Sequence, residues 1–193
     1  MPVGTIIGLA FLIFVGVTIF KGVRIVPQGY KWIVQRLGKY HATLSPGLNF
    51  VIPYVDEVAY KVTTKDIVLD IPSQEVITRD NAVLVMNAVA YINLTAPEKA
   101  VYGIENYTWA IQNLVQTSLR SIVGEMDLDD ALSSRDHIKA KLKAAISDDI
   151  SDWGITLKTV EIQDIQPSTT MQAAMEAQAA AERQRRATVT RAD

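Results

Sequence analysis

The sequence predicts an α+β fold that consists of an N-terminal transmembrane helix, a domain rich first in strands and then in helices, and a long polar helix. Three stretches carry this prediction. Residues 3–20 are uniformly apolar, residues 23–94 have strand patterning, and residues 95–154 have helical patterning before one further strand. A period of two residues marks half-buried strands, and a period of 3.6 marks amphipathic helices. The 193 residues suffice for one ordinary domain or two small ones beside the apolar helix.

The apolar stretch 3–20 contains no charge, amide or proline. As a helix it spans roughly 27 Å, close to the ~30 Å hydrocarbon core of a bilayer. We expect residues 1–22 to form a membrane anchor. A buried core helix and a cleaved signal peptide are the alternatives, although the basic start and the cleavage site of a signal peptide are missing. The anchor residues that we single out are Val3, Gly4, Gly8, Phe11, Phe14, Gly16 and Phe20.

Charge is distributed unevenly along the chain. Residues 1–61 contain six basic and two acidic residues, whereas residues 62–170 contain nine basic and sixteen acidic residues. The basic part directly follows the anchor, so the positive-inside rule predicts an external N-terminus and a cytoplasmic body. The same residues suit anionic headgroups, with a solvated strand face as the alternative. A net charge of −2 gives no reason to expect nucleic acid, and the absence of cysteine excludes disulfides and thiolate zinc sites.

The strand-rich part, residues 23–94, is divided by proline and glycine into short apolar stretches. We expect Pro72 to separate two strands at residues 67–71 and 75–77. Residues 82–94 are apolar on both faces, which predicts a central strand. Residues 23–94 are expected to form a first, mainly β subdomain.

Helical patterning begins at residue 95 and predicts a second, α+β subdomain over residues 95–167. Thr95 is the expected N-cap of a short helix that has Pro97 in its first turn. A longer helix, capped by Asn106 or Thr108, is expected to reach about residue 123. Its predicted apolar stripe comprises Trp109, Leu114, Val115, Leu119 and Ile122.

The last stretch, residues 168–193, is rich in Ala, Gln, Glu and Arg. It buries little apolar surface alone and lacks a stop signal, so we interpret it as the start of a long coiled-coil helix that continues beyond Asp193. Arg183 and Arg186 on this helix are candidate contacts between subunits.

A second candidate for membrane contact is the loop around residues 48–55, through interfacial burial of Phe50 and Tyr54. The alternative is an ordinary buried strand.

No pattern in the sequence predicts catalysis, a cofactor or a metal, because no nucleophile–base pair or phosphate-binding loop is evident. Asp148 and Asp149 fall in the last turns of a predicted helix, where negative charge is unfavourable. Lys139, Lys141 and Lys143 of a neighbouring subunit are the predicted partners of these carboxylates, and plain solvation is the alternative.

Several short motifs occur in order between Gly22 and Asp193. They are Val26-Pro-Gln-Gly-Tyr30, Arg36-Leu-Gly-Lys-Tyr40, Leu44-Ser-Pro-Gly-Leu48, Leu69-Asp-Ile-Pro-Ser-Gln-Glu-Val-Ile77, Thr78-Arg-Asp-Asn81, Leu119-Arg-Ser-Ile122, Met126-Asp-Leu128, Trp153-Gly-Ile155 and Ala181-Glu-Arg-Gln-Arg-Arg-Ala187. With these motifs the chain resembles the stomatin/prohibitin/flotillin/HflK-C (SPFH, band 7) superfamily, and within it the slipin/paraslipin branch.

The resemblance implies an SPFH domain in two small α+β subdomains followed by a coiled-coil helix. It implies that the rim of the first subdomain, with Phe50 and Tyr54, rests against the bilayer. It also implies a scaffold of a bacterial inner (plasma) membrane that assembles with itself into large rings or cages, contacts lipids and organises microdomains. The implied alternative is a regulatory adaptor for a membrane protease of the FtsH type, or a partner of an NfeD-like membrane protein. Members of the superfamily are not regarded as enzymes.

Overall fold

The computed structural model describes residues 3–190 and the side chains of residues 3–186. The predicted range 1–22 therefore begins, and the predicted range 168–193 ends, on residues outside this description. The described chain is mixed α+β, and its contacts divide it into two compact units. The first unit holds the described residues up to Asp66, with Asn93–Glu105 and Asp152–Thr156. The second holds Ile67–Ile92, Asn106–Ser151 and the described residues from Leu157 onward.

The first unit begins with helix α1 (Val3–Gly22), which leads directly into strand β1 (Val23–Val26). β1 pairs with β4 (Gly47–Phe50) in a two-stranded antiparallel ribbon. A three-stranded antiparallel sheet has the order β3-β2-β5, with β2 (Tyr30–Arg36) between β3 (Lys39–Leu44) and β5 (Asp56–Thr63). Val26 of β1 forms a small buried core with Val34 and Leu44 of the sheet.

The short helix α2 (Pro97–Gly103) belongs to the first unit and begins after Ala96. The prediction that Thr95 caps this helix is wrong, because the Thr95 hydroxyl hydrogen-bonds the Thr156 hydroxyl instead. The carbonyl of Gly154 accepts hydrogen bonds from the N–H groups of Thr95 and Ala96, at 3.0 and 2.9 Å. This explains the Trp153-Gly-Ile155 motif as the segment that receives the start of α2.

The sheet of the second unit has the order β6-β7-β8, with β6 (Ile67–Ile77), β7 (Val83–Leu94) and β8 (Ile155–Pro167). The central position predicted for β7 is confirmed. Pro72 does not end a strand as predicted. β6 continues through it with a shift of register between Ile71 and Gln74, which an edge strand tolerates. β7 pairs with β6 on one side and with β8 on the other, and Ile67–Ile92 of these strands belong to the second unit. The predicted division into subdomains at residues 94/95 stays a prediction.

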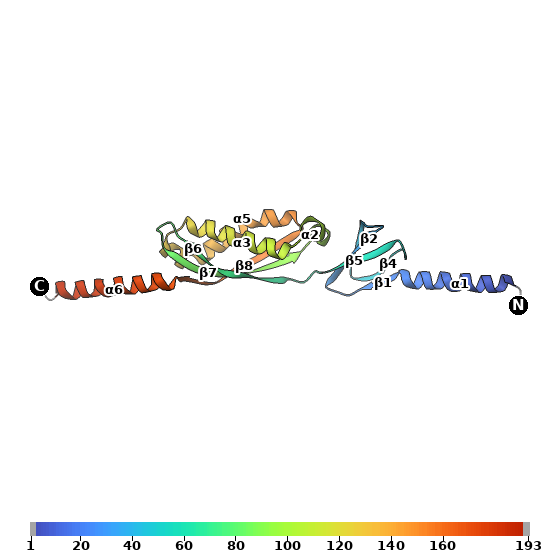
Figure 1. Ribbon diagram of the computed structural model, residues 1–193, viewed down its shortest axis with the longest axis horizontal. Coiled ribbons are helices and arrows are strands. Elements are labelled where there is room, and N and C mark those ends of the chain that lie inside the picture. Colours follow the sequence, from blue (N-terminus) through green and yellow to red (C-terminus); the bar gives the residue numbers. More distant parts are fainter. Residues whose placement is uncertain (1–2, 191–193) are drawn as a thin grey trace. The chain divides into compact units, whose positions relative to one another are not determined.

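Helices α3 (Tyr107–Gly124) and α5 (Arg135–Asp152) lie on the same side of this sheet (Figure 1). α5 buries a residue every four positions, at Ile138, Leu142, Ile146 and Ile150. The stripe predicted for α3 is wrong at Trp109, which is 64% exposed. The residues that α3 buries are Ile111, Val115, Leu119, Ile122 and Val123. Its cap is Asn106, whose side chain accepts from the N–H of Trp109.

The motif Thr78-Arg-Asp-Asn81 is the turn between β6 and β7, and it is held by the Met126-Asp-Leu128 motif. The N–H of Arg79 donates to the carbonyl of Met126 at 2.9 Å. The carboxylate of Asp80 accepts from the N–H of Leu128, the first residue of helix α4 (Leu128–Ser133), at 3.2 Å. Two motifs that are far apart in the sequence therefore form one contact.

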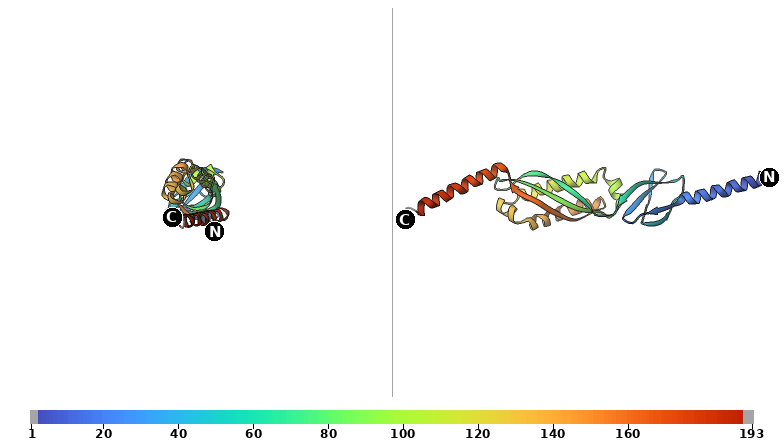
Figure 2. Two further views of the ribbon diagram at one scale, coloured as in Figure 1. Left: turned by 90° about the vertical axis from the view of Figure 1, so that its left-hand side faces the viewer. Right: turned by 90° about the horizontal axis from the view of Figure 1, so that it is seen from below.

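The last helix, α6 (Thr169–Thr190), leaves the end of the second sheet as a separate rod (Figure 2). Its start is held by the N–H of Ser168, which donates to the carbonyl of Val83 at 2.9 Å. From Gln172 to Arg186 every side chain of α6 is exposed.

Candidate membrane-contact site

Helix α1 is long and apolar enough to cross a membrane, and no part of its apolar window is buried. Val3, Phe11, Phe14 and Phe20 are all exposed, and nothing lies within 4 Å of the position that a side chain would take at Gly4, Gly8 or Gly16. The hydroxyl of Thr18 donates to the carbonyl of Phe14, so this polar group is satisfied within the helix. α1 is therefore not a core helix of the described part of this chain.

The β1–β4 ribbon continues from α1 and carries an apolar face. Val23 is the register partner of Phe50, and Ile25 is that of Leu48. Partners in an antiparallel pair point to the same side, and so do alternate residues along a strand. These four side chains therefore share one face of the ribbon, and Ile25, Leu48 and Phe50 are largely exposed.

The loop after β4 adds exposed apolar side chains beside this face. Phe50 and Tyr54 are each 72% exposed, so the alternative of an ordinary buried strand is excluded. We define the apolar rim as this loop, the ribbon face and the tip of the β2–β3 hairpin. Its exposed side chains are Ile25, Leu37, Leu48, Phe50, Ile52 and Tyr54. The sequence had indicated Phe50 and Tyr54 only.

Backbone hydrogen bonds hold the rim loop firmly although its side chains are exposed. The N–H of Val51 donates to the carbonyl of Gly22 at 2.8 Å, and the N–H of Leu37 donates to that of Val55 at 3.3 Å. The N–H of Ile52 donates to the Asp56 carboxylate at 2.9 Å. The loop is thus fixed to the end of α1, to the hairpin tip and to β5.

Asp56 connects the rim loop to the β3-β2-β5 sheet through its carboxylate. Its carboxylate accepts two hydrogen bonds from the guanidinium of Arg36, at 2.6 and 3.0 Å, and only 3% of its side chain is exposed. The Arg36 hydrogen bond, with the Ile52 N–H next in importance, lowers the pKa of Asp56 to about 2. Asp56 therefore remains ionised at neutral pH and keeps the rim loop in place.

Two rim residues have an unusual backbone conformation. Leu37 and Tyr54 have φ angles of 49° and 70°, in the left-handed region that L-residues with bulky side chains rarely adopt. Leu37 is also 82% exposed, in a hairpin turn where Asn, Asp or Gly is preferred. The exposed side chain of Leu37 packs little within this chain, so its apolar surface is available for contact with another phase or molecule.

Basic residues surround the point where α1 joins the rim. The ammonium of Lys21 lies 5.6 Å from the ring centroid of Tyr54, within the range of a cation–π contact. Arg24 follows three residues later and is exposed. Aromatic and basic residues of this kind are typical of the membrane–water interface.

Several of the residues that were predicted to contact a neighbouring subunit already have partners within this chain. Lys139 pairs with Glu161, and the ammonium of Lys143 donates to the carbonyl of Lys158 at 2.9 Å. Arg186 pairs with Glu182 within α6, while Arg183 is exposed. Asp148 and Asp149 are exposed on α5. Their pairing with lysines of a neighbouring subunit stays a prediction, for which Lys139 and Lys143 would have to exchange partners.

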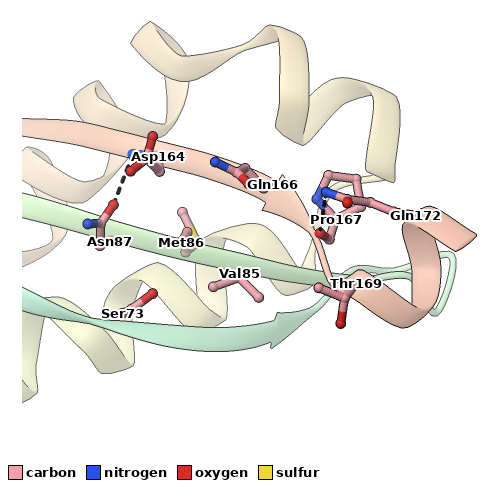
Figure 3. A pocket seen from close by; sticks show the side chains of 9 residues that line it. All are labelled: Ser73, Val85, Met86, Asn87, Asp164, Gln166, Pro167, Thr169 and Gln172. Carbon is pink, nitrogen blue, oxygen red and sulfur yellow. Dashed lines mark hydrogen bonds between the residues drawn. The ribbon is translucent and has the colours of Figure 1, made fainter.

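A concave site of about 300 Å³ lies in the second unit, beside the start of α6 (Figure 3). The side-chain oxygen of Asn87 accepts from the N–H of Asp164 at 2.9 Å, and the amide of Gln172 donates to the carbonyl of Pro167 at 3.2 Å. The first bond joins β7 to β8, and the second holds the joint between β8 and α6. Among the described residues, no three His, Asp or Glu side chains are grouped as a metal site would need.

The comparisons with known proteins agree with the motifs. The model of the SPFH domain / Band 7 family matches residues 24–193. An uncharacterised protein of Mycobacterium tuberculosis is 37% identical over 98% of this chain and 51% of its own length. An uncharacterised protein of Methanocaldococcus jannaschii is 41% identical over 91% of this chain and 87% of its own.

The mitochondrial stomatin-like protein 2 of Homo sapiens is 38% identical over 86% of this chain and 47% of its own length. The chain thus spans about half the length of the mycobacterial and human relatives. An exposed apolar N-terminal helix and stomatin-like relatives both fit association with a membrane. From the family match and these relatives, the chain belongs to the SPFH domain / Band 7 family.

Proposed function

We propose that this chain is a single-pass membrane scaffold whose apolar rim rests in the bilayer interface around its anchor. The observation that carries the proposal is the placement of six exposed apolar side chains at the base of an exposed apolar helix. Exposed apolar surface costs free energy in water and is stabilised at the acyl–headgroup boundary.

Self-association is the second part of the proposal. α6 buries none of its side chains between Gln172 and Arg186, and a helix of this length gains most of its stability from packing. Pairing of α6 with the same helix of other copies would supply that packing. Many modest contacts around a closed ring then add up through multivalency. Such rings or cages would organise microdomains and confine or regulate membrane proteins.

The proposed orientation places the N-terminus outside and the body on the cytoplasmic side of an inner or plasma membrane. Its support is the position of Lys21 and Arg24 directly after the apolar helix. A reporter fused after Asp193 should be active in the cytoplasm, and activity only outside would overturn the orientation.

Labelling with single cysteines tests the rim, because these 193 residues contain no cysteine. An environment-sensitive dye at Phe50→Cys or Ile52→Cys in the full chain, reconstituted in vesicles, should be quenched by lipids that carry quenchers near the headgroup. The same dye at the exposed Arg135→Cys is the control. Equal quenching at both places would contradict the proposed rim.

Electron microscopy of the protein in its own membrane tests the assembly. Rings in the intact protein, reduced to small oligomers when residues 168–193 and any continuation are deleted, are the expected result. Unchanged size on chromatography would count against the role of α6. Co-purification of a membrane protease, or of an NfeD-like protein, at fixed stoichiometry would instead favour a regulatory adaptor.

A further inference from the structure

We propose that a pocket in the first unit binds the phosphate of a phospholipid whose headgroup is negatively charged and carries no ammonium. The pocket lies between the β1–β4 ribbon and the β3-β2-β5 sheet and has a volume of about 320 Å³. It is lined by Arg24, Trp32, Val51, Asp56, Glu57, Val58 and Lys61. The inference rests on the proposed function in one respect, namely that α1 is embedded in a bilayer.

Strand geometry directs two cations into this pocket from facing walls. Val26 of β1 packs against Val34 of β2, and Arg24, two residues before Val26, points to the same side of the ribbon. On the sheet, Trp32 lies on the same side of β2 as Val34, and Lys61 is its register partner on β5. The guanidinium of Arg24 and the ammonium of Lys61 therefore face the same space.

Among the residues that line the pocket, no free carboxylate faces these cations. Asp56 lies on their side of the sheet, but its carboxylate already accepts two hydrogen bonds from Arg36. Glu57 is the register partner of Gln35, whose amide donates to the hydroxyl of Tyr102 on α2. The side chain of Glu57 therefore lies on the opposite, α2-facing side of the sheet. The pocket thus offers two positive charges and no anion to balance them.

A phosphate diester fits this arrangement. Arg24 is exposed, and its side chain makes no hydrogen bond or ion pair with another described residue. Its fixed donors are available to phosphate oxygens, and Lys61 supplies a second point charge. Lys61 is held over the half-buried ring of Trp32, with its ammonium 4.5 Å from the ring centroid. The second cation is therefore already positioned before a ligand arrives.

The same charges select against zwitterionic headgroups. A bound ethanolamine or choline headgroup would bring its own cation close to Arg24 and Lys61, where like charges repel. No free carboxylate on that side of the sheet would receive this cation. A headgroup such as that of phosphatidylglycerol has only the phosphate charge and avoids the repulsion.

The pocket lies at the depth of the headgroups. Its wall residue Val51 donates its N–H to the carbonyl of Gly22, the last residue of α1. Arg24 follows Gly22 by two residues, which is roughly 7 Å along a strand. The headgroup layer of a leaflet is about 5–8 Å thick. Arg24 thus reaches the layer in which lipid phosphates are found.

A phosphate held by both cations would connect the ribbon to the sheet. Arg24 belongs to the ribbon and Lys61 to the sheet, and the buried core between these two walls consists of Val26, Val34 and Leu44. A ligand that binds only the folded state stabilises it in proportion to its occupancy. Binding of the lipid should therefore raise the unfolding temperature of the first unit.

Fluorescence of Trp32 tests this site in the full chain, in non-ionic detergent and with Trp109→Phe and Trp153→Phe as background. Short-chain phosphatidylglycerol should change the emission saturably. Arg24→Gln should weaken binding about tenfold, the effect of losing one charged hydrogen bond. Thermal unfolding with the same lipid is the second measurement. It requires no replacement of tryptophan, and it also serves for Lys61→Gln, in which the contact with Trp32 is lost.

Two matched variants separate the pocket from overall charge. Lys31 precedes Trp32 on β2 and points to the opposite side of the sheet, as does Glu57. Lys31→Gln and Glu57→Gln should both bind phosphatidylglycerol as the parent does. A loss with Lys31→Gln equal to that with Arg24→Gln would overturn the site, because net charge alone would then explain the binding.

The choice of ligand decides the rest. Equal binding of short-chain phosphatidylcholine or phosphatidylethanolamine would overturn the selectivity for negative headgroups, and equal binding of inorganic phosphate would overturn lipid recognition. Flotation of the full chain with vesicles is measured in parallel. If the chain floats but Arg24→Gln binds like the parent, only this inference fails, whereas a chain that does not float contradicts the proposed function.

Discussion

The N–H of Val51 donates to the carbonyl of Gly22 at 2.8 Å, and this bond fastens the end of α1 to the loop of the apolar rim. The two residues approach so closely that a Cβ at Gly22 would lie 2.9 Å from the Val51 oxygen. α1 and the rim are therefore joined by direct backbone contact as well as by the chain between them.

Gly22→Ala should disrupt this joint, because the neighbouring atom is a backbone oxygen that cannot rotate away. We expect a loss of about 1–3 kcal/mol in unfolding free energy, as for other overpacked sites. Denaturant unfolding of the detergent-solubilised chain measures it. Gly8→Ala is the matched control, since nothing lies within 4 Å of the added Cβ. Equal stability of the two variants would contradict the tight contact at Gly22.

Leu37→Asn should stabilise the first unit while weakening membrane contact. Asparagine accepts a positive φ more readily than leucine, so we expect a gain of about 1 kcal/mol in unfolding free energy. The substitution also removes an apolar side chain that is 82% exposed. The fluorescence of a dye at Phe50→Cys should therefore be quenched less by lipids that carry quenchers near the headgroup. Leu37→Gly separates the backbone from the side-chain effect. A variant that gains membrane contact would contradict the proposed role of the hairpin tip.

Asp56 should make stability depend on acid pH. Its pKa in the folded chain, about 2, is below its ordinary value of 3.8, so the unfolded chain takes up the proton first. The stabilising contribution is fully present above pH 3.8 and is lost as the pH falls through about 2. The denaturant midpoint followed from pH 6 to pH 2 should therefore decline. Asp56→Asn should be less stable at neutral pH and show a flatter profile; an unchanged profile would refute the assignment.

Gly154→Ala should be severely destabilising. The added Cβ would lie 2.4 Å from the carbonyl oxygen of Ala96, at a φ of 70° that favours glycine. The cost should reach about 3 kcal/mol or more, because a positive φ and a backbone clash act together. Gly103→Ala is the control, since its site is open and alanine is the better helix former. Thermal unfolding of both variants tests whether the α2 joint depends on Gly154.

Much of the secondary structure was predictable because it depends on local pattern. The apolar window of α1, the central strand β7 and the four-residue spacing of α5 are all readable from side-chain order alone. Trp109 and Pro72 were misread for the same reason. The first lies in the first turn of a helix, where neighbouring elements decide its exposure, and the second lies in an edge strand that absorbs it.

The motifs also identified the family, but their physical roles came from contacts between distant segments. Only the fold shows that the Thr78 turn binds the Met126 segment, or that Gly154 receives the start of α2. A periodic pattern tells which residues share a face of one element, and it does not tell what that face meets.

The sequence by itself thus determined the apolar N-terminal helix, its basic flank and the α+β class, because each depends on composition and period along a single segment. Only the tertiary structure decided which apolar residues remain exposed beside that helix. In the sequence, Leu37 and Ile25 have the pattern of ordinary strand residues. Strand pairing places Ile25 on the same ribbon face as Phe50, and the hydrogen bond from Leu37 to Val55 places Leu37 beside the loop of Tyr54. Burial depends on partners from distant segments, and those partners are fixed only when the chain has folded.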